Sequence, residues 1–153
     1  MYAPLCVRVS VCTRVVSVCV RAEFFTNYTV SIWAWTSRGR GPPGNTSFST
    51  EQGPPGAPPS NVTVQMVGSR MATVSWAPPP RESRNGIITG YWVALSVSGS
   101  EERVMNHSTT QLVLRDLTPY TNYTVRVAAA TVEVGNFSQL ESFSTASDSE
   151  FYV

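Results

Sequence analysis

A pentapeptide occurs twice in this chain, and the two copies lie 95 residues apart. Thr-Asn-Tyr-Thr-Val begins at Thr26 and again at Thr121, and Ser-Phe-Ser-Thr begins at Ser47 and again at Ser142. Two separate matches at one spacing indicate that a structural unit of about that size is repeated. The first copy retains only the end of its unit. We therefore expect an incomplete unit over residues 24–50 and a complete one over residues 58–146.

The second unit consists of short segments in which apolar and polar residues alternate, separated by turn residues such as Gly68 and Asn85. This period of two is typical of half-buried strands. Seven strands are expected near residues 62–66, 72–76, 88–97, 103–105, 111–114, 123–129 and 138–145. From Ala22 onward there is no cysteine, so the unit needs a true hydrophobic core. The pattern predicts an all-β fold of two packed antiparallel sheets, with Trp76 near the centre of the core.

The composition argues against most catalytic and nucleic-acid-binding functions. The 153 residues carry a net charge of +1, all eleven basic residues are arginine, and His107 is the single histidine. A nucleic-acid binder needs an excess of cations, and a catalytic site needs a base, a nucleophile and charge stabilisers. We expect His107 in a connecting loop and Glu101 and Glu102 on a solvated edge. The sequence therefore predicts no enzyme, no metal, cofactor or small-molecule substrate, and no membrane span.

Asparagine usage indicates the compartment. Six of the seven asparagines begin an Asn-x-Ser/Thr triplet, the acceptor for N-linked glycans. These six are Asn27, Asn45, Asn61, Asn106, Asn122 and Asn136. We expect a chain that passes through the secretory lumen to the cell surface or outside, with each triplet exposed to water.

The remaining segments differ in composition from the repeated unit. Residues 1–23 contain Cys6, Cys12 and Cys19 and alternate Val, Cys and Arg, which suits a misassigned first exon better than a signal peptide, and no domain is expected there. Residues 51–57 predict a Pro/Gly spacer, whose Pro55-x-x-Pro58 pattern could alternatively bind an SH3 domain. The tail, residues 147–153, is either the end of a truncated chain or a ligand for a PDZ domain.

Several motifs of the second unit resemble the fibronectin type III family. Trp76 precedes a proline run, Tyr91 begins an alternating apolar strand, and the segment from Leu117 to Tyr123 reads Leu-Thr-Pro-Tyr-Thr-Asn-Tyr. This resemblance implies a seven-stranded immunoglobulin-like sandwich. Its core would contain Trp76, Tyr91, Leu117 and Tyr123. It also implies that the Tyr123 hydroxyl bonds to the backbone just upstream. Residues 24–50 resemble the last two strands of a preceding domain.

By the same resemblance, the chain is expected to be an extracellular protein-binding and spacer module of a glycosylated receptor or adhesion protein. Its partners would be other extracellular proteins, and the parent a single-pass membrane protein. The alternatives are the ectodomain of a receptor-type tyrosine phosphatase or a secreted matrix protein. Trp92 and the loop 132–137 are candidate partner contacts, although neighbouring strands could instead cover Trp92. Residues 38–41, Arg-Gly-Arg-Gly, lack the aspartate of an integrin-binding tripeptide and predict a turn.

The incomplete copy lacks the rest of its core. An isolated hairpin is marginally stable in water. We therefore expect residues 24–50 to fray and to expose Ile32, Trp33 and Trp35.

Overall fold

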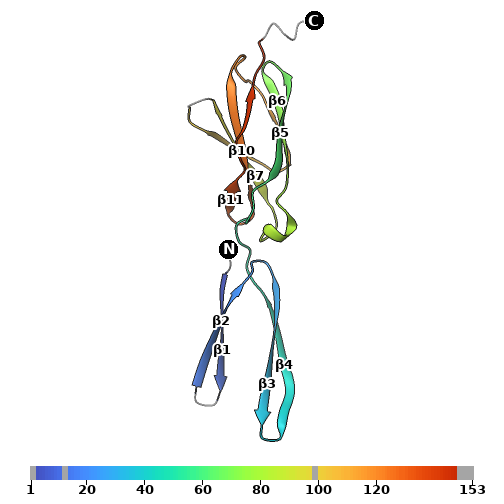
Figure 1. The fold of residues 1–153 in the computed structure, drawn as a ribbon, viewed down its shortest axis with the longest axis vertical. Helices are drawn as coiled ribbons and strands as arrows, with labels where there is room; N and C mark the ends of the chain where they lie inside the picture. The colour runs from blue at the N-terminus through green and yellow to red at the C-terminus, as the bar shows by residue number, and fades with distance from the viewer. Residues whose placement is uncertain (1–2, 12–13, 98–99, 148–153) are drawn as a thin grey trace. The chain divides into compact units, whose positions relative to one another are not determined.

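A computed structural model describes residues 3–11, 14–97 and 100–147 of the chain. The chain divides into two compact units, Met1–Gly53 and Pro54–Val153 (Figure 1). The described residues form β-strands and one short 3₁₀ turn, η1 (Arg81–Ser83). The all-β class expected from the alternation is therefore confirmed.

The first unit consists of two antiparallel hairpins. Strand β1 (Ala3–Val11) pairs with β2 (Arg14–Ala22), and β3 (Asn27–Thr36) pairs with β4 (Gly39–Ser49). The described part of residues 1–23 thus forms a hairpin. That this segment is not a folded domain of its own stays a prediction. The proposed PDZ ligand at the C-terminal end, Phe151-Tyr152-Val153, lies outside the described residues.

The second unit is a sandwich of two antiparallel sheets. One sheet has the order β5-β6-β9, and the other has the order β11-β10-β7-β8, with β12 also paired to β10. The strands are β5 (Ser60–Gly68), β6 (Met71–Ala77), β7 (Gly90–Val97), β8 (Arg103–His107), β9 (Gln111–Leu114), β10 (Asn122–Ala130), β11 (Val134–Phe137) and β12 (Glu141–Ser144). Alternate residues of each strand face the other sheet, which gives β6 its regular pattern of buried and half-buried positions.

Aromatic and aliphatic side chains from both sheets form one core. Trp76 of β6 is 5% exposed, and its ring meets Tyr91 of β7 edge-on, with centroids 5.5 Å apart. Leu117 and Tyr123 are buried in the same cluster. The backbone N–H of Thr118 donates a 2.9 Å hydrogen bond to the Tyr123 hydroxyl, so the tyrosine ring is buried while its polar end is paired.

The hydrogen bonds around this tyrosine are repeated in the first unit. The backbone N–H of Glu23 donates to the Tyr28 hydroxyl over 2.9 Å. The Thr50 hydroxyl donates to the Glu23 carbonyl over 2.7 Å, just as the Thr145 hydroxyl donates to the Thr118 carbonyl over 2.7 Å. Each pair of equivalent atoms is again 95 residues apart. The sequence repeat is therefore also a repeat of local structure.

The first unit has the same corner, but three large apolar side chains farther along β3 are exposed. The rings of Tyr28 and Phe48 stack at 5.8 Å between centroids. Ile32, Trp33 and Trp35 are 48%, 38% and 74% exposed. The three side chains are thus exposed as expected; β3 and β4 pair along their length with an irregularity between Trp33 and Trp35, and the expected fraying stays a prediction.

The C-terminal part of the sandwich differs from the expectation: β12 lies within the expected strand 138–145, whereas β11 falls in the expected loop 132–137 and adds one strand. Both β11 and β12 pair with β10, and Ser138 follows β11. The Ser138 hydroxyl accepts a 3.0 Å hydrogen bond from the Val127 N–H. A side-chain oxygen thus occupies the place of a main-chain acceptor, and the ladder is interrupted there. The expected loop 132–137 is therefore wrong over its last four residues, which form β11.

Part of the Pro/Gly spacer packs on the second unit. The Gly56 N–H donates to the Ser83 carbonyl over 2.7 Å, and the Asn85 amide donates to the Pro54 carbonyl over 2.9 Å. Pro55 is buried, and a side chain at Gly135 would lie 2.8 Å from the Pro55 carbonyl oxygen. This burial leaves the Pro55-x-x-Pro58 pattern unsuited to an SH3 domain.

Candidate interaction surface

The outer face of the sheet β11-β10-β7-β8 carries a covered layer of side chains. Tyr91, Val93 and Leu95 of β7 point into the core, so Trp92 and Ala94 between them point outward. Outward residues of a soluble sandwich normally meet water, yet Ala94 is 1% exposed and Ala128 of β10 is 0% exposed. Neighbouring side chains on this face must therefore cover the two alanines.

The pairing of the strands identifies those neighbours. Ala128 lies opposite Trp92 on one side and Phe137 on the other. Ala94 lies opposite Arg126 and Val104. Residues directly opposite in antiparallel strands project to the same face and contact each other. We call the outward side chains of this face the outer layer. Its members are Trp92, Glu102, Val104, Arg126 and Phe137.

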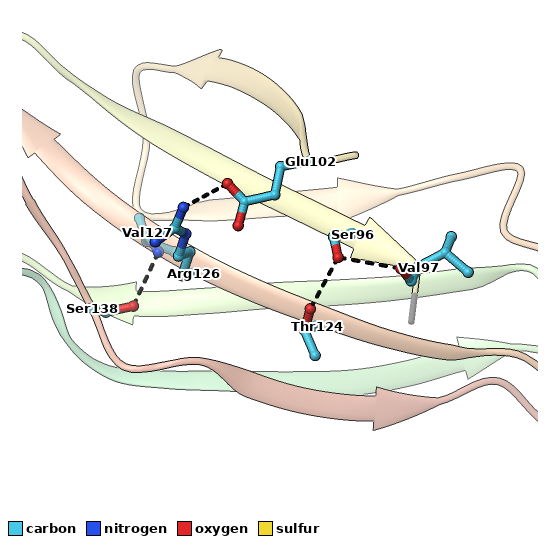
Figure 2. Close-up of polar contacts among 7 residues, drawn as sticks. All are labelled: Ser96, Val97, Glu102, Thr124, Arg126, Val127 and Ser138. Atoms are coloured by element: carbon cyan, nitrogen blue, oxygen red, sulfur yellow. Dashed lines mark hydrogen bonds and ion pairs between the residues drawn. The ribbon is translucent and has the colours of Figure 1, made fainter. Parts of the chain in front are cut away.

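Arg126 holds the outer layer together. Its guanidinium lies 4.5 Å from the centre of the Phe137 ring and makes a 2.6 Å ion pair with Glu102, shown in Figure 2. Both charged side chains are about a third exposed, at 35% and 36%. An ion pair of this exposure contributes roughly 0.2–1 kcal/mol, and an exposed cation–π contact about as much. The arginine is thus held by two weak contacts, and it lies directly opposite the buried Ala94.

Two polar contacts border the layer. The Ser138 hydroxyl, bonded to the Val127 N–H, comes directly after Phe137, and the Ser96 and Thr124 hydroxyls, on the other side of Arg126 in Figure 2, lie 3.4 Å apart. Ser138 also donates its N–H to the Val127 carbonyl over 2.7 Å, so the residue after Phe137 is held to β10 by two hydrogen bonds. The layer therefore has apolar side chains and the Arg126–Glu102 ion pair at its centre, and hydroxyl groups at its borders.

Trp92 and a glycosylation triplet lie side by side on this face. Trp92 is half-buried, and Asn106 of β8 lies directly opposite it. A Cβ built on Gly90 would lie 3.2 Å from the Asn106 side-chain oxygen, so the asparagine side chain rests against β7. All six triplet asparagines are exposed: Asn27, Asn45, Asn61, Asn106, Asn122 and Asn136.

Other sites considered from the sequence take different positions. His107 is the last, half-buried residue of β8 rather than part of a loop, because its backbone pairs with Tyr91. Glu102 is ion-paired, while Glu101 is exposed. At the turn into β4, Gly39 has a φ of +124°, which favours glycine. There the Arg40 guanidinium lies 4.1 Å from the centre of the Trp33 ring.

The described residues contain no group of three or more His, Cys, Asp or Glu placed to bind a metal ion. Among those residues, no helix is long and apolar enough to cross a membrane. From the sequence, Trp92 and the segment 132–137, which contains Phe137, are candidate contacts, and this stays a prediction; the sequence did not indicate that Arg126 and Glu102 join them. The alternation of Arg126 with Val125 and Val127 indicates its outward direction, but its partners depend on which strands are neighbours.

Comparison with known proteins gives a consistent family. Residues 57–144 match the model of the fibronectin type III domain. The human cell adhesion molecule DSCAML1 is 35% identical over 113 residues, which are 70% of this chain and 6% of that protein. The bovine receptor-type tyrosine-protein phosphatase F is 43% identical over 90 residues, 54% of this chain and 5% of that protein. This chain thus spans a small part of the relatives it matches.

A solved structure agrees in fold. The solution structure of the third fibronectin III domain of the human KIAA0343 protein has a TM-score of 0.57 and 28% identity. The alignment covers 61% of this chain and 85% of that one. The likeness therefore extends over most of the solved domain.

Proposed function

Because the chain belongs to the fibronectin type III family, we propose that it is an extracellular protein-binding and spacer module of a glycosylated cell-surface receptor or adhesion protein. The observation that carries the proposal is the match of its sandwich to an adhesion molecule and to a receptor-type phosphatase. Six exposed acceptor triplets support a route through the secretory lumen. The proposed role is non-catalytic, and the partners are other extracellular proteins.

The outer layer supplies the chemistry for partner contact. Arginine and aromatic residues carry a large share of the binding energy in protein interfaces, and Arg126 and Phe137 are held against each other at 4.5 Å. The contacts of Arg126 with Glu102 and Phe137 order its long side chain before a partner arrives. Such ordering lowers the entropic cost of association. We therefore place the partner contact on the Arg126–Phe137 half of the outer layer.

A second candidate is the ectodomain of a receptor-type tyrosine phosphatase. It is favoured by the 43% identity to phosphatase F over 90 residues, against 35% over 113 residues for the adhesion molecule. In that case the present domain has the same binding and spacing role, and the catalytic activity belongs to another part of the parent protein. The full-length transcript separates the two, by the presence or absence of a phosphatase domain.

The test is a cell-binding assay with a secreted, multimerised form of the full chain. We expect it to bind intact mammalian cells, and we expect protease treatment of those cells to remove the binding. Arg126→Ala should weaken binding by about tenfold or more, as for an interface hot spot. Arg115→Ala, at an exposed position after β9, is the matched control. Binding that survives protease treatment, or that falls equally in both variants, would contradict the proposed contact.

A further inference from the structure

We propose that an N-linked glycan on Asn106 lies over the indole of Trp92 and covers that part of the outer layer. The inference rests on the secretory route of the proposed function, since the glycan is added only there. The amide nitrogen of Asn106 forms a bond to the first sugar's anomeric carbon. That carbon's bond to the oligosaccharide's diphospholipid carrier breaks, and the amide proton is lost to the leaving diphosphate or solvent.

The pairing of β7 and β8 places the two groups together. Trp92 and Asn106 are direct partners in the antiparallel ladder, so their side chains lie on one face with Cβ atoms roughly 4.5–5.5 Å apart. Asn106 is exposed and accessible to a modifying enzyme, whereas Trp92 is half-buried and keeps part of its indole uncovered. A sugar on Asn106 therefore starts beside a partly uncovered indole.

Gly90 leaves room for the asparagine side chain beside β7, on the face that carries Trp92. Gly90 and Trp92 are two residues apart on β7 and so point outward together. The side-chain oxygen of Asn106 lies 3.2 Å from the position that a Cβ of Gly90 would occupy. A larger residue at position 90 would push the asparagine away from β7. With glycine there, the amide rests across β7 and its sugar extends over the sheet.

The chemistry of the two surfaces fits. One face of a hexose ring presents C–H groups, which are apolar with a slight positive charge, and an indole presents an electron-rich π face with the opposite charge. Their contact removes apolar area of both from water. The glycan thus contacts Trp92 within the same molecule. The Arg126–Phe137 half of the outer layer stays uncovered and can bind a protein partner.

Another acceptor triplet provides the matched control. Asn122, the first residue of β10 in the same sheet, is also exposed, and its side-chain oxygen accepts a 2.6 Å hydrogen bond from the Ser144 hydroxyl opposite it. Its direct partner is therefore a serine rather than an aromatic residue. A glycan on Asn122 should leave the reactivity of every tryptophan unchanged.

The test measures tryptophan oxidation in the full chain secreted from mammalian cells. Mass spectrometry gives the glycan occupancy of each triplet and the oxidation rate of each tryptophan peptide under N-bromosuccinimide. We expect Trp92 to oxidise several-fold faster in Asn106→Gln than in the occupied wild type. Asn122→Gln should match the wild type, and Trp35, which is 74% exposed, should react equally in all three proteins and so report intact reagent access.

Each other outcome overturns the inference in a distinguishable way. If Asn106 is occupied and its removal leaves the Trp92 rate unchanged, the glycan does not cover the indole. If Asn122 is occupied and Asn106 is not, the secretory route stands and the inference fails. If all six triplets are unoccupied, the secretory route fails and the inference fails with it.

Discussion

Replacement of Trp76 tests the core most directly. The side chain is 5% exposed and its ring meets Tyr91 edge-on at 5.5 Å and 65° between ring planes. Truncating such a residue to alanine removes its buried area and leaves a cavity, at a cost of about 3–5 kcal/mol. A domain of this size is stable by roughly 5–15 kcal/mol. Trp76→Ala should therefore remove a large part of the free energy of unfolding.

The indole nitrogen makes a second variant informative. Within the described residues, Nε1 of Trp76 is buried with no hydrogen-bond partner, a situation that costs about 1–3 kcal/mol. Trp76→Phe keeps an aromatic ring against Tyr91 and removes this unpaired donor. Removing the unpaired donor offsets part of the free-energy cost of the cavity, and this cavity is smaller than the one left by alanine. Trp76→Phe should therefore lose much less stability than Trp76→Ala.

Urea unfolding followed by far-UV circular dichroism measures both variants. Hydrogen exchange of the β10 amides reports on the sandwich separately from the first unit. Trp35→Ala, at a 74% exposed position, is the control and should stay within about 0.5 kcal/mol of the wild type. The reasoning is refuted if Trp76→Ala unfolds at the same urea concentration as Trp35→Ala, or if Trp76→Phe is as unstable as Trp76→Ala.

Two further predictions concern charge. Burial raises the pKa of Tyr91, and the positive charge of Arg84 lowers it by a smaller amount. The unfolded chain therefore loses this proton first, so stability is complete below pH ~10 and falls as the pH rises through the folded pKa. Urea midpoints should show this fall in the wild type and a smaller one in Tyr91→Phe. Arg126→Ala should lower the free energy of unfolding by about 1 kcal/mol, because it removes one ion pair and one cation–π contact. Arg115→Ala should lower it by less than half of that in the same urea unfolding experiment. Equal losses would show that the outer layer adds nothing to stability.

The inner faces of the sandwich could be predicted because they depend on alternation alone. A strand points every second side chain to one face, so a single residue such as Trp76 or Tyr123 sets the direction of its whole segment. Trp76, Tyr91, Leu117 and Tyr123 lie in one buried cluster. No knowledge of strand order is needed to place them on an inner face.

The outer layer could not be predicted in the same way, because it depends on which strands are neighbours. Arg126 and Glu102 are 24 residues apart and meet only because β10 and β8 flank β7. The gap between β11 and β12 contains Ser138, whose hydroxyl accepts a hydrogen bond from the Val127 N–H. A serine in an alternating segment carries no signal of such a bond.

The duplicated corner shows how much structure a short segment specifies by itself. Phe25 and Tyr120 occupy equivalent positions with left-handed φ angles of 49° and 51°, a conformation that costs most residues free energy. The tyrosine hydroxyl bond is present in both copies, although β3 and β4 form a two-stranded sheet and β10 and β12 belong to a larger sheet of the sandwich. The same strained turn thus forms with and without a sandwich core. We infer that the corner is encoded by its own residues, whereas burial of the strands that leave it requires the rest of the domain.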